Sequence, residues 1–183
     1  MLLSTDMFTL IDEDAIAPID DFVKTDADRA WLKGFYPAFM ANSQTGGKTW
    51  GVPFQRSTVV MYYNKEAFKE AGLDPNKAPQ NWKELKEAAH RLTKKDASGK
   101  VVQYGIQIPS TGFAYWMLQT LTTPNDVLLA NEAGTQVTLD SPKVVEALDF
   151  WVGLVKEGVH PAGVVEWGTT PKDFMEKKAA IIV

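Results

Sequence analysis

The stretch WGVPFQRSTVVMYYNKEAF, residues 50–68, decides how the chain is divided. It contains two apolar segments that resemble buried strands, and four consecutive polar residues, Gln55 to Thr58, separate them. Because an unsatisfied polar group in a buried strand costs about 1–3 kcal/mol, these side chains need solvent or a polar ligand. Pro53 lacks a backbone donor and interrupts strand pairing here. The pattern indicates either a crossover between two lobes or an ordinary edge strand.

The composition excludes several classes of protein. The 183 residues are 45% hydrophobic and 23% charged, as in a globular protein. A formal net charge of −4 argues against a nucleic-acid-binding surface, which needs clustered Lys and Arg. The chain has no Cys, which rules out disulfides and thiolate metal sites. No apolar run reaches the length of a membrane span, and the first residues lack the pattern of a signal peptide.

Helices and strands are predicted to alternate along the chain, which favours an α/β fold with mainly parallel strands. Capping residues, Gly and Pro mark most helix ends. The helical segments are predicted at residues 6–14, 26–41 (kinked or ended by Pro37), 65–72, 81–95, 110–121, 142–158 and 170–178. The strands are predicted at residues 1–3, 101–108, 134–139 and 179–183. Because the last of these strands has no turn after it, we expect the chain to be a fragment.

Several motifs, taken in order, resemble those of the extracellular solute-binding proteins of family 1, which serve ABC importers of sugars and glycerol phosphates. They are PFQRST (53–58), YYNKEAFKEAGLDP (62–75), WKEL (82–85), YGI (104–106) and KAAII (178–182). The resemblance implies an incomplete periplasmic-binding-protein-like two-lobe fold of type II. Residues 1–54 would form part of lobe I, residues 55–58 the hinge crossover and residues 59–183 part of lobe II.

The resemblance also implies a function. The protein would be the substrate-binding component of an ABC transporter, periplasmic or extracellular, and would hold a sugar or sugar-like solute between the lobes. Its partners would be this solute and a membrane permease. We expect a monomer with no nucleic-acid partner, no cofactor and no metal.

Candidate ligand contacts in lobe II follow from the resemblance, since sugar sites combine flat aromatic faces with polar groups. Phe113 or Trp116 would stack on the sugar, and Thr111 would contribute a hydroxyl group. Aromatic residues at the start of a helix can equally belong to the core. Trp167 could reach the cleft or merely cover lobe II.

In lobe I and the hinge, the resemblance places further contacts at Thr5, Asp6, Ser57 and Thr58. Thr5 and Asp6 have an alternative role as caps of the first helix. Ser57 matches a hinge position that often bonds the ligand, and Thr58 is next to it.

Arg56 bears on the charge of the ligand. A guanidinium group in a cleft suits a carboxylate or phosphate, which would favour glycerol phosphate or an acidic sugar. Neighbouring residues of a strand point to opposite sides, however. If Ser57 faces the ligand, Arg56 faces away and would pair with an acid such as Asp20 or Asp21.

The alternative of a carbohydrate-active enzyme, such as a glycoside hydrolase, requires two carboxylates across a sugar site. The acidic runs at residues 12–14 and 20–21 are typical of solvated turns, and no acidic residue is framed by an active-site motif. The sequence also contains no P-loop, nucleophile elbow or dinucleotide-binding fingerprint. His90 and His160 have no partner at metal-ligand spacing. We therefore expect no catalytic activity.

Overall fold

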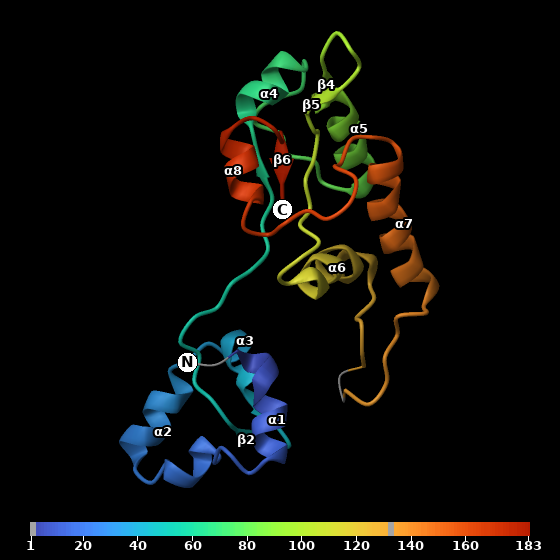
Figure 1. The fold of residues 1–183 in the computed structure, drawn as a ribbon. Helices are drawn as coiled ribbons and strands as arrows, with labels where there is room; N and C mark the ends of the chain where they lie inside the picture. Colours follow the sequence, from blue (N-terminus) through green and yellow to red (C-terminus); the bar gives the residue numbers. More distant parts are fainter. Residues whose placement is uncertain (1–2, 132–133) are drawn as a thin grey trace. The chain divides into compact units, whose positions relative to one another are not determined.

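The computed structural model describes residues 3–131 and 134–183. The chain divides into two compact units, Met1–Thr58 (unit 1) and Val59–Val183 (unit 2), shown in Figure 1. The boundary falls directly after the polar residues Gln55 to Thr58. Residues 1 and 2 of the strand predicted at residues 1–3 lie outside the described residues.

Unit 1 consists of short helices and one hairpin, and its elements are bounded by local signals. Thr25 accepts a hydrogen bond from Asp28 N at 3.1 Å, and Asp28 accepts one from Thr25 N at 2.8 Å, forming a capping box. Gly46 and Gly47 have φ values of 57° and 73° and form the hairpin turn. The elements are η1 (Ser4–Asp6), α1 (Met7–Asp12), η2 (Ile19–Phe22), α2 (Asp26–Lys33), α3 (Pro37–Met40), η3 (Ala41–Ser43), β1 (Gln44–Thr45) and β2 (Lys48–Thr49).

The helix predicted over residues 26–41 was expected to be kinked or ended by Pro37, and the structure shows that it ends before this residue. The structure has two helices there, because α2 ends at Lys33 and α3 begins at Pro37. Proline is favoured at the first position of a helix, where its missing N–H has no partner to lose. Pro37 therefore starts a helix and does not kink one.

The apolar segments on both sides of the four polar residues are not buried strands. Among the described residues of this stretch, strand structure begins only at Tyr62, and Phe54 is 82% exposed. Pro53 cannot donate to a ladder, and the polar run offers no apolar face to bury. The stretch therefore remains an irregular connection.

Unit 2 is built around short strands whose named pairs are antiparallel. β3 (Tyr62–Tyr63) pairs with β6 (Ile181–Ile182), and β4 (Lys94–Lys95) pairs with β5 (Val101–Gln103). Parallel pairing occurs in two isolated bridges, Tyr104 with Ala179 and Gln107 with Ile182. The prediction of mainly parallel strands is corrected accordingly, because among the described residues parallel pairing is confined to residues 104–107 against residues 178–183, where a backbone hydrogen bond also joins Gly105 to Ile181.

Two strand predictions in unit 2 also need correction. The strand predicted at residues 101–108 is regular only through Gln103. Residues 134–139 form no named strand, and Val137 makes one isolated bridge to Ala130. Val137 is also exposed, so this segment has no buried face to stabilise a strand.

The helix starts predicted in unit 2 were confirmed where a capping side chain is present. Asn64 accepts hydrogen bonds from two backbone N–H groups of α4, Asn81 from Glu84 N, and Ser141 from Val144 N. The helical elements are α4 (Lys65–Glu70), α5 (Trp82–Leu92), α6 (Ala114–Thr122), η4 (Thr123–Asn125), α7 (Pro142–Lys156) and α8 (Thr170–Met175). None of the helices in the described part of the chain is both long and apolar enough to cross a membrane.

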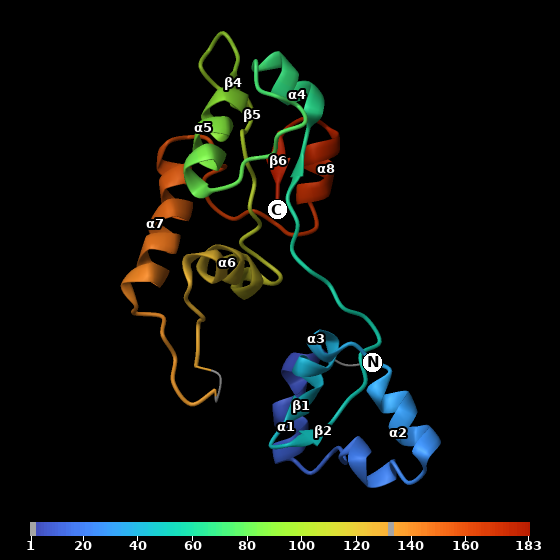
Figure 2. The same cartoon turned by 180° about the vertical axis from the view of Figure 1, so that it is seen from behind.

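The core of unit 2 fixes the segment that leads into the candidate site. Ile106 and Ile108 are buried with Phe68, Leu92 and Ile181 in one apolar cluster. Figures 1 and 2 show α8 beside β6 and α5 beside β4 and β5. Burial of a large apolar side chain contributes about 1.5–3 kcal/mol. The buried side chains of Ile106 and Ile108 therefore fix residues 104–108, which lead into the loop before α6.

Candidate ligand-binding site

Four aromatic residues of unit 2 form one cluster, called here the aromatic cluster: Phe113, Tyr115, Trp116 and Trp167. Phe113 occupies the N-cap position of α6, and Tyr115 and Trp116 lie in the first turn of that helix. The ring of Phe113 stacks on Trp116 with centroids 4.8 Å apart and an interplanar angle of 23°. Trp167 meets Phe113 edge-on at 5.7 Å, and Tyr115 meets it edge-on at 6.3 Å. Phe113 is thus the centre of the cluster.

Hydrogen bonds join the two loops that carry these rings. Ser110 N donates to Val165 O at 2.8 Å, and Val165 N donates to Ser110 Oγ at 2.9 Å. Thr111 accepts a hydrogen bond at Oγ1 from Trp167 N at 3.1 Å. These bonds hold Trp167 beside α6 although it lies far from that helix in sequence.

Gly112 is required for this approach. Its φ is +71°, a conformation that L side chains rarely adopt, and a Cβ there would lie 3.2 Å from Trp167 Cβ. The glycine between Thr111 and Phe113 therefore lets the loop turn directly against the tryptophan.

The exposed rings of the cluster are Tyr115 and Trp167. Tyr115 is 41% exposed and Trp167 is 40% exposed, whereas Phe113 and Trp116 are half-buried. A ligand would therefore meet Tyr115 and Trp167 first, with Phe113 supporting them from behind. Tyr115 was not among the predicted site residues. The run of aromatics at positions 113, 115 and 116 is the signal that could have identified it.

Thr111 also contacts a residue that the sequence analysis missed, Glu166. Thr111 Oγ1 donates to Glu166 Oε2 at 2.8 Å. No Lys, Arg or His nitrogen of residues 3–131 and 134–183 lies within 4.0 Å of this carboxylate. The structure therefore brings Thr111, Phe113, Trp116 and Trp167 together and adds Tyr115 and Glu166.

His160 forms hydrogen bonds in the interior to the segment that precedes Thr111. It is almost fully buried, and its Nε2 accepts a hydrogen bond from Ile108 N at 3.0 Å. Its Nδ1 lies 2.8 Å from Pro161 O, and Nε2 also lies 3.1 Å from Ile108 O. Burial lowers the pKa of His160, because desolvation disfavours the charged imidazolium. Among the described residues, no group of three or more His, Asp and Glu could hold a metal ion.

Four of the predicted ligand contacts, Thr5, Asp6, Ser57 and Thr58, lie in unit 1. Thr5 and Asp6 are exposed in η1, and Asp6 Oδ2 accepts a hydrogen bond from Leu3 N at 3.2 Å. Asp6 thus makes a contact of the helix-capping kind. Ser57 and Thr58 are exposed, and neither side chain has a hydrogen-bond partner in the described part of the chain.

From the sequence we expected that Arg56, if it faces away from the ligand, would pair with Asp20 or Asp21. The structure shows no such pair for Arg56 among the described residues. Its Nε and Nη2 donate to Phe39 O at 3.0 and 2.8 Å, and Nη2 also donates to Ser43 Oγ at 2.8 Å. Asp20 instead accepts a hydrogen bond from Thr49 N at 2.6 Å. The reason is geometric, because the planar, forked guanidinium can bond the carbonyl of Phe39 and the hydroxyl of Ser43 at the same time.

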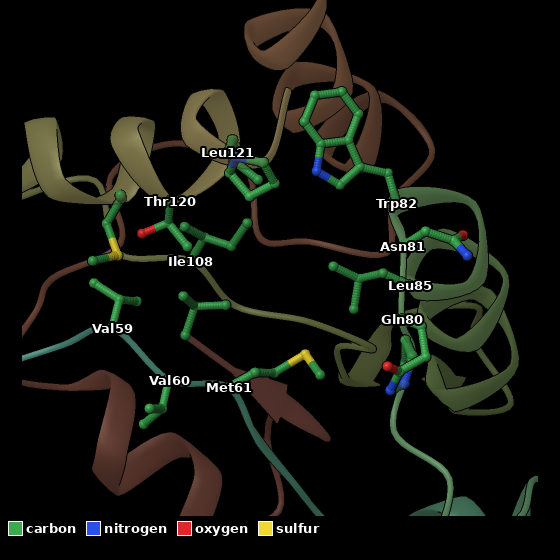
Figure 3. Close-up of a pocket in the computed structure, with 14 residues that line it drawn as sticks. Val59, Val60, Met61, Gln80, Asn81, Trp82, Leu85, Ile108, Thr120 and Leu121 are labelled. Atoms are coloured by element: carbon green, nitrogen blue, oxygen red, sulfur yellow. The ribbon is translucent and has the colours of Figure 1, made fainter. Parts of the chain in front are cut away.

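A separate apolar pocket of about 230 Å³ lies in unit 2. Figure 3 shows Val59, Met61, Leu85, Ile108 and Leu121 converging on it. None of the predicted site residues lines this pocket.

Three polar side chains of the pocket, those of Gln80, Asn81 and Thr120, bond to their own neighbours. Asn81 Oδ1 accepts from Glu84 N at 2.9 Å, and Thr120 Oγ1 donates to Trp116 O at 2.8 Å. Gln80 Nε2 donates to Ala78 O at 2.9 Å. A polyhydroxylated solute would find few partners here, so the aromatic cluster is the better candidate site.

Comparison with known sequences gives a consistent family assignment. The profile of the bacterial extracellular solute-binding protein family matches residues 1–183. Over 156 residues the chain is 33% identical to the sn-glycerol-3-phosphate-binding periplasmic protein UgpB of Brucella abortus (strain 2308), covering 82% of this chain and 35% of that protein. The chain thus spans about a third of the length of the curated relatives it matches.

Solved structures show the same fold. An ABC transporter solute-binding protein from Thermotoga lettingae bound with α-D-tagatose has a TM-score of 0.77 at 21% identity, covering 95% of this chain and 44% of that one. An ABC substrate-binding protein from Listeria monocytogenes in complex with cycloalternan has a TM-score of 0.70 at 26% identity, covering 96% and 44%. The fold is therefore the periplasmic-binding-protein-like α/β fold, of which the chain spans less than half. From this fold and the match along the whole chain, we conclude that the chain belongs to the bacterial extracellular solute-binding protein family.

Proposed function

We propose that the protein is the substrate-binding component of an ABC importer and that it binds a sugar or sugar-like solute at the aromatic cluster. Membership of the family supports the role in transport. It also supports a periplasmic or cell-surface location and a membrane permease as the partner. The protein acts as a monomer, has no nucleic-acid partner and does not catalyse a reaction.

The observation that carries the proposal is the pair of exposed rings, Tyr115 and Trp167, beside the polar side chains Thr111 and Glu166. Aromatic faces cover the apolar C–H faces of a sugar ring, and polar side chains bind its hydroxyl groups. Phe113 and Trp116 pack behind the exposed rings, so these are held before the ligand arrives. Such preorganisation reduces the entropic cost of binding.

We further propose that residues 55–58 act as the hinge of the protein, with residues 1–54 part of lobe I and residues 59–183 part of lobe II. The irregular backbone of this segment and the boundary after Thr58 support it. Hinges are short segments that absorb a large change in φ and ψ. Ser57 and Thr58, and Thr5 and Asp6 of η1, are secondary candidates for ligand contacts.

An anionic solute is the second candidate. The name of the Brucella relative, which binds sn-glycerol 3-phosphate, favours it. Arg56 is the candidate cation for such a ligand, although its guanidinium is already bonded to Phe39 O and Ser43 Oγ. We therefore propose a neutral sugar-like solute ahead of an anionic one as the ligand.

Ligand-dependent tryptophan fluorescence of the complete gene product that contains residues 1–183 tests the proposal. We expect a saturable change with at least one of α-D-tagatose, maltose and mannobiose, because Trp116 and Trp167 lie in the cluster. Tyr115→Ala should weaken binding, and Val152→Ala, an exposed change on α7, should not. Absence of any response to sugars, polyols and glycerol phosphate would contradict the proposal, and release of products from oligosaccharides would indicate an enzyme.

A further inference from the structure

Glu166 carries a negative charge beside the aromatic cluster, and no Lys, Arg or His of the described residues pairs with it. Among residues 3–131 and 134–183, the one hydrogen-bond partner of its carboxylate is the hydroxyl of Thr111, at 2.8 Å from Oε2. The side chain is exposed, and Trp167 follows it directly in the chain. The carboxylate and the backbone N–H of Trp167 therefore meet at the same hydroxyl group, that of Thr111.

The hydrogen-bonding capacity left at Glu166 and Thr111 is that of acceptors. The hydroxyl proton of Thr111 is donated to Glu166, and one lone pair of Thr111 accepts from Trp167 N at 3.1 Å. A carboxylate has about four acceptor positions, and a hydroxyl oxygen has two. Three acceptor positions on Glu166 and one on Thr111 thus remain, and these two side chains have no donor left to offer.

A ligand placed on this surface must bring hydrogen-bond donors. Sugar hydroxyl groups can donate to a carboxylate, and such charge-assisted bonds are stronger than neutral ones. A phosphate ester at neutral pH brings mostly acceptors and a negative charge, which the carboxylate repels. The chemistry of the pair therefore matches a neutral polyhydroxylated compound and opposes an anion.

We propose that Glu166, oriented by Thr111, is a specificity-determining residue that selects neutral polyhydroxylated solutes over phosphate esters. This inference rests on the proposed function, because it assumes that the aromatic cluster is the binding site. It also separates this protein from the relative named for sn-glycerol 3-phosphate. Arg56 is the one positively charged residue among the predicted site residues. Its guanidinium is bonded to Phe39 O and Ser43 Oγ of unit 1.

Glu166→Gln is the matched test, because the amide has nearly the same shape and keeps an oxygen that accepts from Thr111. A merely structural brace between the loops would survive this change, whereas the charge would be lost. Glu87→Gln is the control, since Glu87 is also exposed in unit 2 and makes no ion pair within 4.0 Å in the described part of the chain. Equal melting temperatures of the three proteins would show that folding is unaffected.

Isothermal titration calorimetry of the complete gene product would use α-D-tagatose, maltose and mannobiose as neutral probes, and sn-glycerol 3-phosphate and glucose 6-phosphate as anionic probes. The wild type should bind at least one neutral probe at least about 10-fold more tightly than either phosphate, from the charge repulsion. Glu166→Gln should weaken neutral binding by roughly 10-fold, the loss of one charge-assisted bond. The ratio of neutral to phosphate affinity should fall by a similar factor, and Glu87→Gln should match the wild type.

Two results would overturn the inference while leaving the proposed function in place. One is tighter binding of a phosphate ester than of every neutral probe by the wild type. The other is an unchanged affinity ratio in Glu166→Gln although Tyr115→Ala weakens binding. If no probe binds to the wild type, the proposed function fails and the inference fails with it.

Discussion

The phenyl ring of Phe113 lies stacked against the indole ring of Trp116, with centroids 4.8 Å apart and planes inclined by 23°. The same phenyl ring receives the edges of Tyr115 and Trp167. One side chain therefore supports three others, and its main contribution is to hold the exposed rings in place. In the proposed function, stacking on a ligand would fall to its two exposed neighbours, Tyr115 and Trp167.

Phe113→Ala should affect both the fold of the cluster and ligand binding. Removal of a packed phenyl ring costs up to about 3–5 kcal/mol, and we expect about 2 kcal/mol here because Phe113 is half-buried. Near-ultraviolet circular dichroism should lose tryptophan signal, and solute affinity should fall together with it. Val152→Ala, an exposed change on α7, serves as the control. A Phe113→Ala variant with an unchanged tryptophan spectrum would contradict the supporting role.

Arg56→Ala should reduce the stability of unit 1 without changing the affinity for a neutral solute. The variant loses the hydrogen bonds from the guanidinium to Phe39 O and Ser43 Oγ. Hydrogen bonds that involve a charged group contribute about 1.5–3 kcal/mol, and partial exposure of Arg56 places the expected loss near 1 kcal/mol. Denaturant unfolding and calorimetry on the complete gene product measure the two effects separately.

Arg56→Lys is the informative companion to this variant. Lysine keeps the charge but lacks the planar fork, so it should recover only part of the stability. If Arg56→Ala keeps its stability and instead loses binding of sn-glycerol 3-phosphate, the role of Arg56 in binding an anion would be established in place of the structural role.

The helix caps were predictable from sequence because each depends on contacts within a few residues. Asn64, Asn81 and Ser141 cap their helices through backbone N–H groups two or three residues away. The strands were less predictable, because pairing joins distant segments such as Tyr62 and Ile182. The alternation of apolar and polar residues within a strand does not indicate the direction of its partner, and the pairs β1–β2, β3–β6 and β4–β5 are antiparallel.

The candidate site was predictable in part, since Thr111, Phe113, Trp116 and Trp167 were expected there, whereas Tyr115 and Glu166 were not. Phe113 and Trp116 stand close together in the sequence, and the resemblance to a known family pointed to the loop that contains them. Glu166 meets Thr111 across 55 positions, a contact that no local pattern encodes. Arg56 shows the same limit, since its carbonyl partner Phe39 lies 17 positions away.

His160 should make the protein less stable in mild acid. Burial lowers its pKa in the folded state below the ordinary value of 6.5, whereas the unfolded chain has the ordinary value. The unfolded state therefore binds more protons below pH 6.5. The contribution to the free energy of unfolding is complete above that pH and is lost as pH falls towards the folded-state pKa. The slope for one proton is at most about 1.4 kcal/mol per pH unit.

His160→Gln removes this titration and checks the assignment. Glutamine has no proton to gain, so the free energy of unfolding should depend less on pH between about 7 and 5. The variant should also be less stable at pH 7, because the two backbone bonds at Ile108 and Pro161 are not reproduced by one amide. Chemical denaturation at several pH values gives the comparison. Identical pH dependence in the wild type and the variant would show that another group causes the acid sensitivity.

Gly105→Ala should be severely destabilising, because the backbone of Gly105 lies directly against α5. A Cβ at this position would come within 1.9 Å of Ala89 O and 2.5 Å of Ala89 C. Both are backbone atoms of a helix packed in the core, so neither can rotate away. We expect a loss of about 3 kcal/mol or more in the free energy of unfolding, the upper range for an overpacked core.

Gly153→Ala is the matched control, since the nearest heavy atom to its Cβ would be Glu157 Oε1 at 4.0 Å. That change, inside α7, should stabilise the protein by about 0.5–1 kcal/mol through helix propensity. Thermal melts of both variants therefore should move in opposite directions, and a Gly105→Ala protein as stable as the wild type would show that α5 is not packed on this segment as described.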